Sequence, residues 1–260
     1  MEHVRQNYIG GTWVPAAAFA PNVNPSNLKD VIAHYARARS AEAEAAVAAA
    51  KAAFAAYSRS TPQERYDALK KISDEILARK DELGRLLSRE EGKTLPEGVG
   101  EVVRAGQIFA FFAGEAVRTT GEKIASIRPG VDVEVTREPV GVMVLITPWN
   151  FPIAIPAWKI APALAYGNCV VFKPADLVPG SAHALSEIIA RSGLAAGVFN
   201  LVMGRGAEIG ETLLEHPDVA AVSFTGSVAT GSRGRGGRDR GGTDEEGAAG
   251  DGRQEPSRRA

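Results

Sequence analysis

The chain has 260 residues, of which 45% are hydrophobic, and a formal net charge of -1. This composition supports a folded core of one large or two modest domains, and the balanced charge favours neither nucleic acid nor an anionic membrane as a partner. One cysteine excludes an internal disulfide, no apolar run approaches the roughly 18 residues of a membrane span, and the polar N-terminus is unlike a secretory signal, so we expect a cytoplasmic protein.

Residues 1–117 are predicted to form short strands and then helices. The strand-like runs Tyr8–Val14 and Val31–Tyr35 are separated by turn-forming proline and asparagine residues. From Ser40 to about Val117 the pattern is helical. Within it, Thr61-Pro62-Gln63-Glu64 predicts a helix start, with threonine at the cap, proline in the first turn and glutamate at the third position.

Residues 118–140 are predicted to form a hairpin. Polar and apolar runs alternate from Arg118 to Glu138, on both sides of the turn signal Pro129-Gly130.

Residues 141–231 alternate between strand-like and helix-like runs, which predicts an α/β fold with a doubly wound parallel, Rossmann-like sheet. The expected strands are Val142–Thr147, Cys169–Lys173, Phe199–Val202 and Val219–Phe224. The expected helices lie near Ala157–Tyr166, Ser181–Ser192 and Glu208–Leu214.

Polar or small residues follow each of these four strands. They are Asn150 after the first, Lys173 and Asp176 at the second, Gly204 and Gly206 after the third, and Thr225-Gly226-Ser227 after the fourth. Ligands of open α/β sheets bind beyond the carboxyl ends of the strands, so four such loops at one edge predict a bound dinucleotide.

Each of these residues also has a structural interpretation. Lys173 could be a solvated strand end, Asp176 or Ser227 a helix cap, and Asn150 a turn residue. A carboxylate at Asp176 would also accept from a ribose 2'-hydroxyl and repel a 2'-phosphate, which favours NAD over NADP. Ser227 beside Gly226 would suit a pyrophosphate at a helix N-terminus. The stretch Gly204–Gly210 misses the G-x-G-x-x-G pattern by one residue, and a plain turn explains it equally well.

Cys169 is predicted to be structural. It lies inside an apolar strand, where a buried thiol ionises poorly and behaves as a small hydrophobe. The four histidines show no metal-ligand spacing, so we expect no metal site.

The composition changes after Gly231. Residues 232–260 contain no valine, isoleucine, leucine, methionine, cysteine or aromatic residue, and 15 of the 29 are glycine or arginine. We expect this tail to be disordered, because it cannot bury enough apolar area to order itself. An Arg-Gly-rich RNA-binding tail is the alternative, but its seven arginines are nearly balanced by six acidic residues.

The sequence T-P-W-N-F-P at residues 147–152 resembles the signature of the aldehyde dehydrogenase superfamily. Further similar stretches follow that family's order and spacing and extend the resemblance over about residues 7–231. They are Tyr8–Val14, Phe111–Ala116 with Thr120-Gly121-Glu122, Lys173-Pro174-Ala175, Gly197–Asn200 and Phe224–Ser227. Residues 147–204 most resemble members that act on small semialdehydes such as 2-oxoglutarate semialdehyde.

The resemblance implies NAD(P)-dependent oxidation of an aldehyde to an acid. Asn150 would hold the oxyanion, Trp149 and Phe151 would pack beside it, and Lys173 would bond the adenosine ribose. The cofactor-binding residues implied are Ile146, Thr147, Pro148, Trp149, Lys173, Asp176, Gly206, Thr225, Gly226 and Ser227. NAD is the expected cofactor, with NADP as the alternative, and the hairpin implies a homo-oligomer in the intact family.

The family's nucleophilic cysteine and general-base glutamate have no counterpart in this sequence, so we expect no turnover. In the tail, the codons read one frame over permit Q-L-E-M-G-G-K-N-P, which resembles the family's glutamate motif. We infer a frameshift near Gly231 and a truncated chain. A non-catalytic nucleotide-binding or partner-binding module is the alternative class of function.

Overall fold

The structure is a computed structural model that describes residues 4–228 and 231. The predictions made for residues 232–260, including the frameshift and the RNA-binding alternative, lie outside these residues. Within the described ranges, no helix combines the length and apolar character that crossing a bilayer would need.

Five short strands precede the first helix. They are β1 (Val4–Arg5), β2 (Asn7–Ile9), β3 (Thr12–Val14), β4 (Phe19–Val23) and β5 (Val31–Ala36). β2 and β3 form a hairpin within the run Tyr8–Val14, which was predicted to be strand-like, and the turn is made by Gly10 and Gly11 at positive φ, where glycine is favoured. Strands β1, β5 and β4 form a separate small sheet, of which the sequence predicted only β5.

Four helices follow, as the helical pattern predicts. They are α1 (Ser40–Tyr57), α2 (Pro62–Ala78), α3 (Lys80–Glu91) and α4 (Leu95–Ala116). α2 begins as expected, because the Thr61 hydroxyl accepts from the Glu64 amide at 3.2 Å and the Glu64 carboxylate accepts from the Thr61 amide at 2.7 Å.

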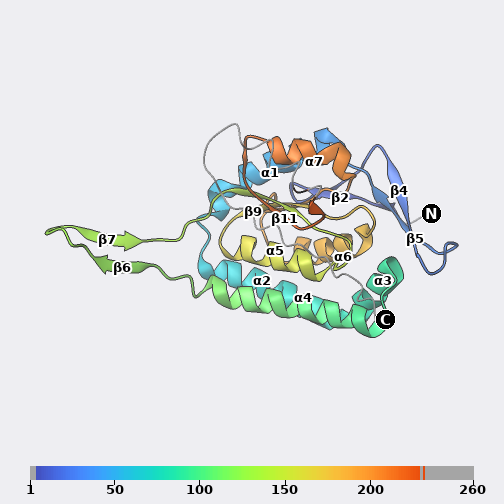
Figure 1. Cartoon of the computed structure of the whole chain (residues 1–260), viewed down its shortest axis with the longest axis horizontal. Helices are drawn as coiled ribbons and strands as arrows, with labels where there is room; N and C mark the ends of the chain where they lie inside the picture. The colour runs from blue at the N-terminus through green and yellow to red at the C-terminus, as the bar shows by residue number, and fades with distance from the viewer. Residues whose placement is uncertain (1–3, 229–230, 232–260) are drawn as a thin grey trace, which may run out of the picture.

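The predicted hairpin consists of β6 (Glu122–Ala125) and β7 (Asp132–Val135), which pair antiparallel. It extends away from the body of the molecule (Figure 1). All eight strand residues are exposed, whichever face of the hairpin they lie on.

The remaining elements alternate in the predicted order: β8 (Val142–Ile146), α5 (Ala154–Ala165), β9 (Cys169–Lys173), α6 (Pro179–Ala190), β10 (Phe199–Leu201), α7 (Gly206–Glu215) and β11 (Val219–Phe224). The main sheet has the order β11-β8-β9-β10-β2-β3, and its first four strands are parallel. The sheet is mixed as a whole, because the opening hairpin adds two strands through the antiparallel pairing of β2 with β10.

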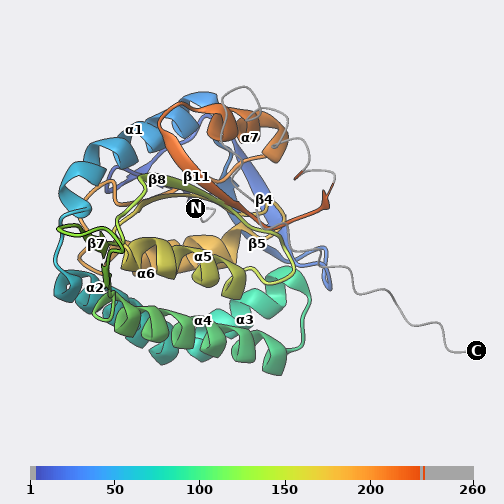
Figure 2. The same cartoon turned by 60° about the vertical axis from the view of Figure 1, so that its left-hand side comes forward.

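Helices cover both faces of the main sheet (Figure 2). α1 and α7 lie on one face and α5 and α6 on the other, while α2, α3 and α4 form a further layer beyond α5 and α6. The largest fully buried side chains include Phe109 of α4, Leu145 of β8 and Phe172 of β9, so the core runs through the sheet into the outer helices. The central strands β8, β9 and β10 are therefore mostly buried along their length.

Candidate functional site

The carboxyl ends of β8, β9 and β11 meet at one edge of the main sheet. Ile146 is in register with Lys173 on one side and with Phe224 on the other. The next residues continue the ladder, since the Thr147 amide donates to the Lys173 carbonyl at 3.3 Å and the Thr225 amide donates to the Ile146 carbonyl at 3.0 Å. The structure therefore brings the predicted loops together at a single border.

The strand order places a topological switch point between β8 and β11. From β8 the chain moves to β9 and β10 on one side, and it returns to β11 on the other. Open α/β sheets bind their ligands at such a point, beyond the carboxyl ends of the strands. The β8 loop carries Asn150, and the β11 loop carries Thr225-Gly226-Ser227.

Asn150 lies in a turn after β8, as the structural interpretation proposed. Its side-chain oxygen Oδ1 is buried and has no hydrogen-bond partner in the part of the chain that the structure describes. Turn geometry does not account for a buried amide oxygen without a partner, because such a group costs free energy. Trp149 and Phe151 were expected to pack, but they are 53% and 45% exposed, and the Phe151 ring packs against Lys93.

Lys173 is buried, with 5% of its surface exposed, so the interpretation as a solvated strand end is wrong. Burial lowers the pKa of its ammonium group, and the Asp176 carboxylate opposes that change. A Cβ added at Gly206 would lie 3.9 Å from Nζ, which places the start of α7 beside this lysine.

Asp176 is exposed and does not cap the following helix. The N-cap of α6 is Val178, without a side-chain cap hydrogen bond. Asp176 lines a small pocket together with Pro174, Gly204 and Arg205, so the loops after β9 and β10 meet there.

Val228 and Gly231, which follow the β11 loop, are both helical. The Ser227 carbonyl accepts from the Gly231 amide at 3.0 Å, the spacing of a first α-helical hydrogen bond, so Ser227 occupies the cap position. A Cβ at Gly226 would lie 2.6 Å from the Phe224 ring, which explains glycine there. Ser227 would occupy this same position whether it acts as a helix cap or helps to bind a pyrophosphate at the helix N-terminus.

Lys159 of α5 is a residue of this edge that the sequence analysis missed. Its Nζ donates to Oγ of Ser223 in β11 at 2.6 Å, and burial lowers its pKa to about 8. One signal was available, because Lys159 is the single charged residue of α5.

Cys169 is fully buried in β9, as predicted, and burial raises the pKa of its thiol to about 12. No cluster of His, Cys, Asp or Glu with metal-binding geometry occurs within residues 4–228 and 231. A separate hollow of about 690 Å³ lies at the base of the hairpin, lined by Arg59, Arg65 and Arg137 among others, and holds none of the predicted site residues.

Comparison with known proteins gives a consistent result. Residues 13–234 match the aldehyde dehydrogenase family. An alpha-ketoglutarate semialdehyde dehydrogenase of Haloferax volcanii is 42% identical over 224 residues, which are 85% of this chain and 46% of the relative. An alpha-ketoglutaric semialdehyde dehydrogenase of Bacillus subtilis is 41% identical over 223 residues, 85% of this chain and 46% of the relative. The chain spans about half the length of the curated relatives it matches.

Solved structures agree with the sequence matches. The crystal structure of betaine aldehyde dehydrogenase from Staphylococcus aureus in complex with NAD+ superposes with a TM-score of 0.87 at 35% identity, over 90% of this chain and 47% of that one. An aldehyde dehydrogenase of Brucella melitensis biovar abortus 2308 gives a TM-score of 0.87 at 36% identity, over 89% of this chain and 48% of that one.

Proposed function

The chain belongs to the aldehyde dehydrogenase family, and from this premise we propose that the β8–β11 edge binds a nicotinamide dinucleotide for the oxidation of an aldehyde. The observation that carries the proposal is the convergence of Asn150, Lys173 and Thr225 on one sheet edge at a topological switch point.

The residues of this edge fit such a cofactor. Lys173 offers a buried ammonium group for a ribose hydroxyl, and Asp176 offers a carboxylate that favours NAD over NADP. Gly206, at the start of α7, leaves space beside the lysine. We assign binding of the pyrophosphate to Thr225, Gly226 and Ser227. The residues that would line the pocket around the nicotinamide are Ile146, Thr147, Pro148 and Trp149. NAD(P), when bound, accepts the hydride that leaves the substrate.

Asn150 is assigned the oxyanion role. Its amide N–H would donate to the substrate oxygen as negative charge develops there, a contribution of about 3 to 4 kcal/mol in comparable sites. The proposed substrate class is a small semialdehyde, supported by the two semialdehyde dehydrogenases among the relatives.

We propose further that the 260-residue chain binds NAD without turnover. Its single thiol is that of Cys169, which is fully buried and has a raised pKa, so it supplies no nucleophilic thiolate. The same observation favours the second candidate function, a nucleotide-binding module without catalysis. Assembly into a homo-oligomer through the hairpin is proposed as well, because the apolar side chains of β6 and β7 are exposed.

Thermal unfolding with and without NAD+, combined with an NADH assay on 2-oxoglutarate semialdehyde, tests these proposals. We expect a single sharp transition whose midpoint rises with NAD+ concentration, and no NADH production. Absence of any midpoint shift at millimolar NAD+ would contradict nucleotide binding. Steady NADH formation that Asn150→Ala abolishes would contradict inactivity while supporting the oxyanion assignment.

A further inference from the structure

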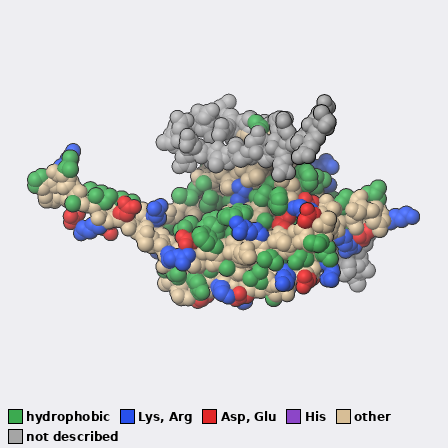
Figure 3. Space-filling model, turned by 60° about the horizontal axis from the view of Figure 1, so that its bottom comes forward, with side chains coloured by type: hydrophobic (Ala, Val, Ile, Leu, Met, Phe, Trp, Pro, Cys, Tyr) green, Lys and Arg blue, Asp and Glu red, His purple; other side chains and the backbone are tan. Residues whose placement is uncertain are grey.

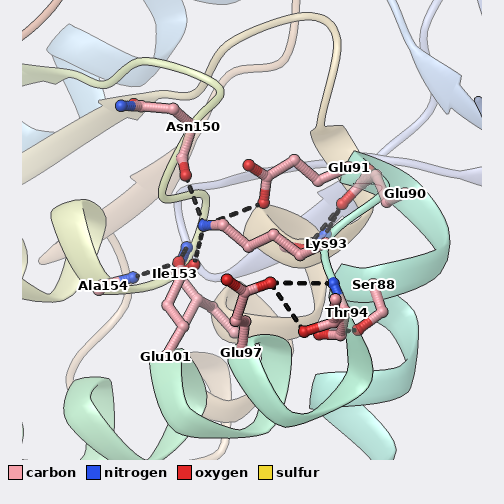
Figure 4. A network of polar contacts seen from close by, with 11 residues as sticks. Ser88, Glu90, Glu91, Lys93, Thr94, Glu97, Glu101, Asn150, Ile153 and Ala154 are labelled. Carbon is pink, nitrogen blue, oxygen red and sulfur yellow. Dashed lines mark hydrogen bonds and ion pairs between the residues drawn. The ribbon is translucent and has the colours of Figure 1, made fainter. Parts of the chain in front are cut away.

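The corner between α3 and α4 reaches the loop that carries Asn150 (Figure 4). Lys93 lies in the turn between the two helices, and its Nζ donates to the backbone carbonyl of Asn150 at 2.6 Å. The same Nζ donates to Oε2 of Glu101 at 2.8 Å and lies 3.8 Å from the centroid of the Phe151 ring. One ammonium group therefore holds the peptide that joins Asn150 to Phe151.

Glu101 holds the other end of the loop. Its Oε1 accepts from the backbone amides of Ile153 at 2.9 Å and Ala154 at 3.1 Å. These amides belong to the first turn of α5, whose N-cap Ile153 has no side-chain cap hydrogen bond of its own. A carboxylate from α4 thus satisfies free N–H groups at the start of α5, where the helix dipole also favours negative charge.

The corner that carries Lys93 is itself tightly built. α3 ends at Gly92 with a φ of 90°, and Thr94 and Glu97 form a capping box at the start of α4. A Cβ added at Gly98 would lie 2.5 Å from Oγ of Ser88 and 2.7 Å from the Gly84 carbonyl oxygen. The two helices are therefore in contact at their glycines, and Lys93 extends from a backbone with little freedom to move.

The Asn150 side chain is held differently from its backbone. Figure 4 shows the amide nitrogen turned away from Lys93, while the backbone carbonyl points toward it. Within the described residues, Oδ1 has no hydrogen-bond partner, whereas the backbone carbonyl is bound by Lys93, so the backbone is the part of Asn150 that these hydrogen bonds hold. We propose that Lys93 and Glu101 are positioning residues, which fix the backbone of residues 150–154 so that the Asn150 amide faces the reacting carbonyl oxygen. This inference rests on the proposed function.

The pair is buried, and this affects the choice of variants. The side chain of Glu101 is 2% exposed and that of Lys93 is 19% exposed, and Lys93 also lies 3.2 Å from a Glu91 carboxylate oxygen. Removing one partner leaves a buried charge uncompensated, which lowers stability whatever the role of the pair. A neutral double variant separates stability from positioning.

The test uses the whole 260-residue chain and the NMR order parameter of the Phe151 backbone N–H, which shares a peptide plane with the Asn150 carbonyl. We expect about 0.85 in the wild type and below about 0.6 in Lys93→Met, which keeps the alkyl stem over Phe151 but loses the donor. Because Thr147, Pro148 and Trp149 of the same loop are assigned to the nicotinamide, NAD+ affinity should fall about tenfold. Lys93→Arg, which keeps a charged donor, should restore both values.

The double variant Lys93→Met with Glu101→Gln neutralises the Lys93–Glu101 pair but also lacks the bond to Asn150, and Glu91 keeps its carboxylate without Lys93. We expect its unfolding midpoint to rise above that of Lys93→Met while the Phe151 N–H stays mobile and NAD+ affinity stays low. Recovery of all three would show a purely structural ion pair and overturn the proposal. Glu97→Gln is the matched control, because it makes the same change one turn earlier on α4 at a carboxylate whose hydrogen bonds come from Thr94 and not from the Asn150 loop.

The two readouts distinguish this inference from the function on which it rests. Suppose that the Phe151 N–H is rigid in the wild type and mobile in Lys93→Met, but that the wild type does not bind NAD+. This result would support the positioning of the backbone and contradict the cofactor assignment. A wild-type order parameter in Lys93→Met would overturn the positioning role even if NAD+ binds.

Discussion

The Asn150 loop and the β6–β7 hairpin are fixed in opposite ways. The loop is held by Lys93 and Glu101 from the α3–α4 corner, through hydrogen bonds to its backbone. The hairpin projects from the body with apolar side chains along it, and its strand residues are all exposed (Figure 3). The proposed site is therefore supported by residues of this chain itself. The hairpin, in contrast, has exposed apolar surface that a second chain would have to cover.

Among the substitutions that test this difference, Glu101→Ala should lower the unfolding free energy most. It leaves the amides of Ile153 and Ala154 without their acceptor and the Lys93 charge without a main partner, so we expect about 3 to 5 kcal/mol lower unfolding free energy. The control on the hairpin is Asp132→Ala, which removes a mostly exposed ion pair with Lys123. It should change the unfolding free energy by less than about 0.5 kcal/mol. Urea unfolding measures both, and equal losses would contradict the comparison.

The next largest effect should be a pH dependence of the unfolding free energy that comes from Glu90 of α3. Its carboxylate accepts from the amides of Gly180 and Ser181 at the start of α6, yet burial raises its pKa from 4.5 to about 7. The hydrogen bonds from residues 180 and 181 favour the charged form, and the nearby Glu91 carboxylate opposes it.

The folded chain therefore keeps a proton on Glu90 between pH 4.5 and 7 that the unfolded chain releases. Unfolding free energy should fall as pH rises through this window, by about 1.4 kcal/mol per pH unit and about 3 kcal/mol in all. Glu90→Gln should flatten this slope, and Glu134→Gln on the hairpin should leave it unchanged. A Glu90→Gln chain with the wild-type slope would refute the assignment.

Lys173→Met tests the sheet edge itself. Removing a buried ammonium group that bonds a ribose hydroxyl should weaken NAD+ binding about tenfold, or about 1.4 kcal/mol. Calorimetric titration gives the dissociation constant. Lys123→Met on the hairpin is the control, and an equal loss in both variants would argue against a specific contact at Lys173.

Ile124→Thr with Val133→Thr should have the smallest effect on stability. These residues face each other across β6 and β7 and are both exposed, so unfolding free energy should change by less than about 0.5 kcal/mol. Sedimentation velocity should nevertheless show smaller species, because the variant loses apolar surface for self-association. Unchanged assembly would remove the hairpin from the proposed contact between copies.

The parallel strands and their order along the chain were predictable, because buried strands are short apolar runs bounded by turn signals. The meeting of Asn150, Lys173 and Thr225 at one edge followed from that alternation. β1 and β4 were missed, since neither shows a clear apolar pattern, and the addition of β2 to β10 joins segments about 190 residues apart. No local rule specifies such a pairing.

The support of the site was less predictable than its position. Lys93 lies in an ordinary turn and meets Asn150 only in the folded chain, 57 residues away. Glu101 did carry a signal, because it falls on the buried helical face of α4 with Gly98, Val102 and Ala105. A carboxylate at a core position indicates a buried partner, but sequence periodicity cannot say that the partners are the amides at the start of α5.

The most direct test of nucleotide binding at this sheet edge is a crystal structure of the chain soaked with NAD+. We expect the adenosine ribose within hydrogen-bond distance of the Lys173 Nζ, the pyrophosphate at Ser227 and the nicotinamide toward Asn150. Density for the nucleotide in the arginine-lined hollow at the base of the hairpin, or at any place away from the ends of β8, β9 and β11, would contradict this expectation.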